Sequence, residues 1–200
     1  MKDDIETRFK RNLARVDNLL KVYKEICSTG QGRRPVQAGD VLRSATVFLH
    51  ATLEDFLRSI AAWKLPGANA DVLDGVPLVG LNTHGRPEKF FLGALASHGE
   101  KTVQEVIRES VIASLVRETY NDTKEISKLL KSICLQTDEL NSQFAVLNDM
   151  MSRRHQIVHR ADANPNPGTG NHHANSIGIK KVKEWAAAVE EFVTAVLGKV

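Results

Sequence analysis

The chain has 200 residues, of which 42% are hydrophobic and 26% are charged, and its formal net charge is +3. This length suffices for one domain with its own core, and the composition is that of an ordinary soluble globular protein. The small positive charge does not by itself indicate a nucleic-acid partner. Because the two cysteines, Cys27 and Cys134, are far apart in sequence, we expect neither a disulfide framework nor a cysteine-type metal site.

The amino-terminal residues are followed by no apolar signal core, and no apolar run approaches the length needed to span a membrane. We therefore expect a cytoplasmic protein with no membrane partner.

Two long helices are predicted in the first third of the chain. Apolar residues keep helical spacing from about Asp3 to Ile26 and again from about Ala38 to Lys64. Asp40 is the expected N-cap of the second helix. Glu54 and Asp55 are expected to face solvent or to pair with Arg58 at short helical spacing.

Pro and Gly residues interrupt the helical pattern from Leu65 to Pro87. We interpret this stretch as an ordered insertion, because it keeps several apolar residues. Helical spacing returns from Lys101 to Tyr120, and Asp122 with Glu125 has the spacing of a capping box at the start of the next helix. A final helix is predicted from about Lys180 to Leu197.

These elements predict an all-α fold, a helical bundle with an irregular insertion after the second helix. We expect a single helical domain over residues 1–200, with the insertion at about 65–87 and a loop at about 163–176.

One predicted helix carries an unusual residue in its apolar stripe. The stripe contains Leu140, Leu147 and Met151, and Arg154 follows where the spacing calls for an aliphatic side chain. An unpaired buried guanidinium costs several kcal/mol. We therefore expect Arg154 to reach the surface, to pair with a carboxylate, or to line a cleft or subunit interface.

His155 and His159 are four residues apart, so a helix places them on one face at the spacing of a two-histidine metal site. Zinc would need further ligands, and the three neighbouring arginines oppose a dication. His172 and His173 could supply further nitrogens, but the loop that contains them favours incidental surface histidines. We therefore expect no metal and no cofactor.

Arg154 and His159 together suit the cleavage of a phosphodiester. A guanidinium donates planar hydrogen bonds to phosphate oxygens, and an imidazole exchanges protons near neutral pH. RNA supplies its own nucleophile, the 2′-hydroxyl, so no metal is required. However, five residues of separation place the two side chains about 140° apart around an ideal helix. The alternative is a helix whose basic C-terminal end merely complements the helix dipole.

The motif Arg154-His155-Gln156-Ile157-Val158-His159 resembles the Arg-polar-x-x-x-His motif of HEPN-domain proteins, a helical-bundle family rich in ribonucleases. The wider run from Arg153 to Asp162 is similar to the motif region of its RiboL-PSP-HEPN branch. Two earlier stretches also resemble that branch, His50-Ala51-Thr52-Leu53-Glu54-Asp55-Phe56-Leu57 and the segment from Glu109-Ser110-Val111 to Tyr120-Asn121-Asp122. The resemblance extends from about Val41 to Asp162.

This resemblance implies a metal-independent endoribonuclease that leaves a 2′,3′-cyclic phosphate and a 5′-hydroxyl. Carried over to this chain, Arg154 would stabilise the phosphate and His159 would act as general acid and base. His155 would orient the pair or bind substrate, and Arg153 and Arg160 would contact the RNA substrate.

The resemblance also implies a homodimer in which the motifs of two subunits face one shared cleft, which would resolve the 140° separation. Many members of the family are toxins or anti-phage defence effectors controlled by a cognate antitoxin, such as a nucleotidyltransferase-like partner. The alternative within the family is a non-catalytic helical module that binds a protein or nucleotide partner. A third hypothesis is a purely structural helical domain, in which Arg154 only caps its helix.

Overall fold

The computed structural model describes residues 1–28, 35–79, 92–165 and 174–200. Within these ranges the chain forms seven α-helices and no β-strand, so the prediction of an all-α fold is confirmed. The helices are α1 (Lys2–Ser28), α2 (Val36–Lys64), α3 (Ala70–Leu73), α4 (Val103–Leu115), α5 (Thr123–Ser132), α6 (Asn141–Arg160) and α7 (Ile179–Lys199). Short 3₁₀ turns are formed by Leu65–Gly67, Leu92–His98 and Asp138–Leu140.

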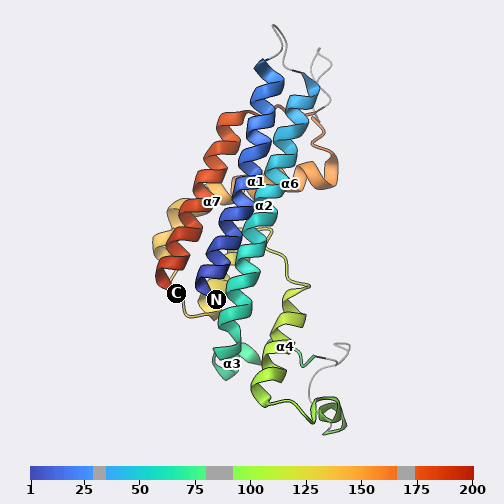
Figure 1. Ribbon diagram of the computed structural model, residues 1–200, viewed down its shortest axis with the longest axis vertical. Coiled ribbons are helices and arrows are strands. Elements are labelled where there is room, and N and C mark those ends of the chain that lie inside the picture. Colours follow the sequence, from blue (N-terminus) through green and yellow to red (C-terminus); the bar gives the residue numbers. More distant parts are fainter. Residues whose placement is uncertain (29–34, 80–91, 166–173) are drawn as a thin grey trace.

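The long helices α1, α2, α6 and α7 form a bundle. α1 and α2 run antiparallel along most of their lengths, and α6 and α7 pack against α2 and against each other (Figure 1). α4 lies beside the C-terminal part of α2, beyond the end of the bundle where both chain termini lie (Figure 1). α2 is therefore the central element, since it contacts α1, α4, α6 and α7.

The bundle core consists of the apolar stripes that the helical spacing predicts. The rings of Phe9 and Phe56 meet edge to face with their centroids 5.9 Å apart. Each fully buried side chain of this kind contributes about 1.5–3 kcal/mol of hydrophobic stabilisation. The largest fully buried side chains come from α2, from α5 through α6, and from α7: Leu42, Leu49, Leu53, Phe56, Leu57, Ile60, Ile126, Leu130, Leu140, Leu147, Met150 and Phe192.

The expected insertion is described up to Val79. This part consists of the 3₁₀ turn Leu65–Gly67 and the short helix α3, after which the Val79 N–H donates to the Ser110 hydroxyl of α4 at 2.9 Å. Residues 80–87 of the expected insertion lie outside the described residues.

The predicted N-cap of the second helix is wrong. α2 begins at Val36, directly after Pro35, whose backbone is extended with φ −60° and ψ 146°. Nothing between Pro35 and Asp40 stops a helix, so the helix starts one turn earlier than the acidic residue suggested. Asp40 instead accepts a hydrogen bond from Arg43 at 3.2 Å, one turn along α2.

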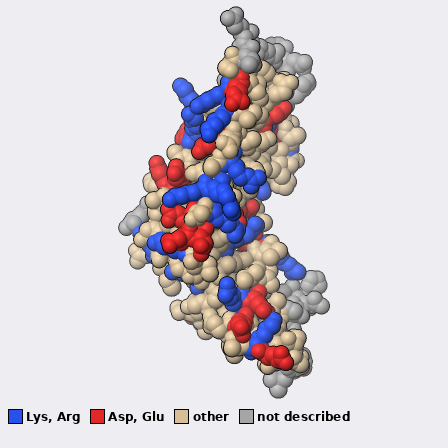
Figure 2. Space-filling view, in the orientation of Figure 1, with Lys and Arg blue, Asp and Glu red and all other residues tan. Residues whose placement is uncertain are grey.

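The surface carries both signs of charge. Figure 2 shows Lys and Arg side chains interspersed with Asp and Glu along the face of the bundle that it presents. No helix in the described ranges is long and apolar enough to cross a membrane.

Candidate active site

The helix α6 stays regular through the whole motif. It runs to Arg160 and ends at Ala161, which has a left-handed backbone with φ 48°, followed by Asp162 with φ 57°. The N–H groups of Ala161 and Asp162 both donate to the Gln156 carbonyl and close the helix end. Because the helix is not distorted between Arg154 and His159, their directions differ by about 140°.

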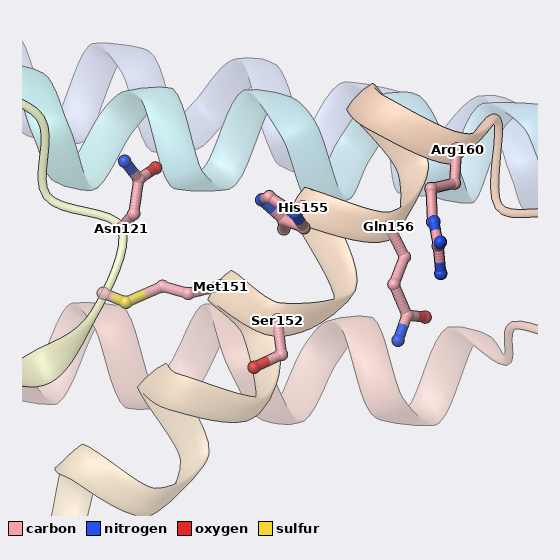
Figure 3. Close-up of a pocket in the computed structure, with 6 residues that line it drawn as sticks. All are labelled: Asn121, Met151, Ser152, His155, Gln156 and Arg160. Carbon is pink, nitrogen blue, oxygen red and sulfur yellow. The ribbon is translucent and has the colours of Figure 1, made fainter.

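The outer face of the last turns of α6 lines a depression of about 510 Å³ (Figure 3). Its lining residues are Asn121, Met151, Ser152, His155, Gln156 and Arg160. His155 and His159 are both exposed, and their rings lie 4.5 Å apart between centroids. The two imidazoles therefore form a pair at the edge of an open, polar hollow.

Arg154 is half-buried, and it lies about 140° around α6 from His159. Its Nη1 donates to the side-chain oxygen of Asn121 at 3.2 Å, whereas its Nε is buried without a hydrogen-bond partner. Among the described residues, no carboxylate forms an ion pair with Arg154, although the adjacent Arg153 has one. Arg154 thus reaches the lining of the depression only through its hydrogen bond to Asn121, which is one of the lining residues.

Asn121 is a site residue that the sequence analysis missed. It lies in the segment between α4 and α5, and Figure 3 shows it across the depression from His155. Its backbone N–H donates to the Glu125 carboxylate at 2.6 Å, while Asp122 accepts from the Glu125 N–H as the N-cap of α5. The capping pair predicted from sequence is therefore present, but the carboxylate of Glu125 binds the peptide of Asn121. Asn121 could have been indicated by sequence, because it lies in the Glu109–Asp122 segment that resembles the RiboL-PSP-HEPN branch.

The preceding residue, Tyr120, is fixed from α2. Its side chain is buried, its carbonyl accepts from Nε2 of His50 at 3.1 Å, and its N–H donates to Glu54 at 3.3 Å. Of the two alternatives predicted for Glu54, the structure has the pairing with Arg58, at 3.9 Å, with the Glu54 side chain only 12% exposed. His50 and Glu54 of α2 thus contact the site indirectly, through the backbone of Tyr120, which precedes Asn121.

Burial lowers the pKa of His50, and the charges of Arg154 and Arg58 lower it further, while Glu54 opposes them. A neutral His50 with its proton on Nε2 can donate to the Tyr120 carbonyl, which only accepts. Burial also raises the pKa of the Tyr120 hydroxyl to about 12, with the charge of Glu118 adding to the effect. Both groups are therefore uncharged at neutral pH.

Arg153 occupies a different environment from Arg154. It donates to the fully buried carboxylate of Asp162 at 2.8 Å, and Arg43 of α2 donates to the same oxygen at 2.7 Å. The Asn175 carbonyl accepts from both guanidinium groups. A Cβ at Gly39 would lie 2.9 Å from Nη1 of Arg43, so the glycine leaves room for this guanidinium. We refer to Arg43, Arg153, Asp162 and Asn175 as the Asp162 cluster.

The structure thus separates the five candidate site residues into three groups. His155 and Arg160 line the depression, with His159 beside His155. Arg154 does not line the depression itself but donates to Asn121, which does. Arg153 belongs to the Asp162 cluster, and its side chain is only 17% exposed.

Within the described ranges, no group of three or more His, Cys, Asp or Glu side chains is arranged to hold a metal ion. His172 and His173 lie outside the described residues.

A protein-family model described as RiboL-PSP-HEPN matches residues 10–198. The matched region includes all five candidate residues and Asn121, and it extends beyond the Val41–Asp162 resemblance at both ends. Neither a curated protein nor a solved structure matches the chain.

The Asp162 cluster predicts a large loss of stability for Asp162→Ala. Removing the carboxylate leaves two guanidinium groups facing each other in a mostly buried place, and breaking a buried pair costs about 3–5 kcal/mol. The measurement is the free energy of unfolding from urea titration followed by circular dichroism. As a control, Asp149→Ala removes a half-exposed ion pair with Lys181 and a hydrogen bond from the Trp185 indole. The loss of the ion pair should cost less than about 1 kcal/mol, in addition to the loss of the hydrogen bond. Equal losses in the two variants would contradict this account of Asp162.

The lowered pKa of His50 predicts that the protein becomes less stable as the pH is lowered. In the unfolded chain His50 takes up its proton near the ordinary value of 6.5, whereas in the folded protein it does so only at lower pH. Below about pH 6.5 the unfolded state therefore binds more protons, and the free energy of unfolding decreases as the pH falls. His50→Gln can keep the hydrogen bond to Tyr120 but cannot titrate, so its urea midpoint should fall less steeply from pH 7 to 5. Parallel curves for the two proteins would rule out this contribution.

Proposed function

Since the chain belongs to the RiboL-PSP-HEPN family, we propose that it is a metal-independent endoribonuclease whose active site lies at the C-terminal end of α6. The observation that carries this proposal is the state of Arg154. Its guanidinium is half-buried beside a polar depression, is bound by a neutral amide and has no carboxylate partner among the described residues. Such a group binds an anion favourably, because its charge is not already compensated.

Arg154 is the proposed ligand of the scissile phosphate. Attack by the 2′-hydroxyl places additional negative charge on the phosphate oxygens, and a fixed guanidinium stabilises that charge more than it stabilises the ground state. The partial burial of Arg154 strengthens this interaction, because water screens it less than at an open surface.

The two neighbouring histidines, whose rings are tilted 44° to each other, are the proposed proton-transfer groups. His159 takes the proton from the 2′-hydroxyl or delivers one to the leaving 5′-oxygen, which yields a 2′,3′-cyclic phosphate and a 5′-hydroxyl. His155, whose ring lies 4.5 Å from that of His159, orients it or contacts the substrate.

The two remaining arginines have different proposed roles. Arg160 is exposed and lines the depression, where it can contact a neighbouring phosphate of the RNA. Arg153, which was expected to contact RNA as well, holds Asp162, so we assign its contribution to fixing the end of α6.

We also propose a homodimer with a shared cleft. Arg154 and His159 point about 140° apart on an undistorted helix, so one chain does not direct both at the same phosphate. A second copy facing the outer side of α6 would bring its own His159 near the first copy's Arg154. Val158, which is 48% exposed near the histidines, is available for contact between copies. The biological role that fits the family is a cytoplasmic toxin or anti-phage effector, with a nucleotidyltransferase-like antitoxin as its partner.

Arg154→Ala and His159→Ala should each lower RNA cleavage at least about a hundredfold while the circular dichroism spectrum is unchanged. Cleavage is measured on a fluorescent single-stranded RNA in the presence of EDTA, and growth inhibition is measured on expression in a bacterial host. Arg11→Ala and His98→Ala are matched controls away from the depression and should retain the activity. Cleavage that EDTA stops, or that survives both substitutions, would exclude this mechanism. A folded wild-type protein that cleaves no RNA would favour the non-catalytic module.

The shared cleft predicts complementation between two inactive variants. Mixed Arg154→Ala and His159→Ala subunits form heterodimers in which one of the two symmetric clefts has both residues intact. Co-refolded equal mixtures should therefore recover about a quarter of the wild-type activity, because half of the dimers are mixed. If each chain held a complete site, no activity would return on mixing.

A further inference from the structure

Two consecutive arginines of α6 are held in chemically different ways. Arg153 is bound to the carboxylate of Asp162, so its charge is neutralised at 2.8 Å. Arg154, at the depression, is bound to the amide oxygen of Asn121 at 3.2 Å. An amide carbonyl accepts a hydrogen bond from a guanidinium without cancelling its charge, whereas a carboxylate both accepts and neutralises.

The oxygen and nitrogen of the Asn121 side-chain amide can be told apart at this contact. A guanidinium has only donors, so the Asn121 atom that contacts it must be the oxygen. The hydrogen bond therefore fixes the side-chain amide of Asn121 as well as the guanidinium.

Asn121 can position Arg154 only if Asn121 is itself fixed, and three contacts fix it. Two backbone groups of Tyr120 are bound from α2: its carbonyl accepts from Nε2 of His50, and its N–H donates to the carboxylate of Glu54. The N–H of Asn121 is bound by Glu125 of α5 at 2.6 Å. Arg58 extends this attachment, because its guanidinium donates to the Glu118 carbonyl at 2.9 Å. The segment before α5 is thus held by two helices.

We propose that Asn121 is a positioning residue that aims the Arg154 guanidinium at the depression while leaving its positive charge available to an RNA phosphate, and that His50 and Glu54 set the place of Asn121 through the Tyr120 peptide. The inference rests on the ribonuclease function proposed above, since it concerns the residue that would bind the scissile phosphate. Asn121 does not itself take part in proton transfer.

The test compares Asn121→Asp with Asn121→Ala. Asp has nearly the same shape as Asn, so it places a carboxylate against Nη1 of Arg154 and neutralises it. We expect Asn121→Asp to lower kcat for RNA cleavage at least about a hundredfold, the loss expected when a charge-stabilising donor is removed. Asn121→Ala leaves the charge free but loses the alignment, so we expect a smaller loss of about tenfold in kcat/KM. Wild-type activity in Asn121→Asp, or a greater loss in Asn121→Ala, would overturn the inference.

A rescue experiment tests the part played by α2. His50→Ala removes the donor to the Tyr120 carbonyl and should lower kcat/KM in the same direction as Asn121→Ala. His50→Gln supplies a donor again and should restore cleavage at pH 7.5. If His50→Ala retains full activity in a folded protein, α2 does not position Asn121.

A stability cycle separates failure of this inference from failure of the proposed function. Asn121→Asp should raise the melting temperature when Arg154 is present, because it creates an ion pair, and should not raise it in the Arg154→Ala background. This comparison needs no RNA and no catalysis. A wild-type protein that cleaves no RNA would exclude the proposed function, while the cycle would still decide whether Asn121 controls the charge of Arg154. An equal effect of Asn121→Asp in both backgrounds would overturn the inference.

Discussion

The carboxylate of Asp162 joins the end of α6 to α2, and the candidate site lies in the turns of α6 just before that end. Asp162 is fully buried, has a left-handed backbone, and accepts from Arg43 of α2 and Arg153 of α6. Two helices that are distant in sequence are therefore joined at the turn that follows the motif. Because a buried charge must be paired to be tolerated, this turn has few alternative positions. The exposed residues His159 and His155 lie one and two turns before it on the same helix.

The same region contains two guanidinium groups in different electrostatic environments, one bound by a carboxylate and one by an amide. The proposed ribonuclease would need positive charge that is fixed in place, yet a charge is usually fixed by pairing it with an opposite charge. The chain divides these requirements between neighbours: Arg153 is paired and holds the backbone, and Arg154 is held by an amide. The neutral state of His50 belongs to the same arrangement, because a protonated imidazole beside Arg154 and Arg58 would add a third positive charge in a buried place.

Helical spacing predicted the parts of the molecule that depend on local sequence. The long helices α1, α2 and α7 begin and end within two residues of their predicted limits, because each buries one continuous apolar stripe. Arg154 was identified from the same periodicity, as a charged residue within a stripe. The N-cap at Asp40 was predicted wrongly, because a local capping preference does not exclude a helix that starts earlier at Pro35. The pairings of Arg43 with Asp162 and of Arg154 with Asn121 join residues 119 and 33 positions apart, and no local pattern contains that information.

The closure after α6 has a consequence for how related chains can diversify. Ala163 and Ala174 form an isolated antiparallel bridge, and Asn175 donates from its backbone and side chain to the Asp162 carbonyl. The segment that leaves the bundle after α6 and the segment that returns before α7 are thus hydrogen-bonded to each other at residues 162–163 and 174–175. Since the entropy of closing a loop grows only slowly with its length, the residues between these two points can be lengthened, shortened or replaced by a foreign segment at little cost to the bundle. Sequence variation and insertion of a reporter tag are accordingly best accommodated between these two points.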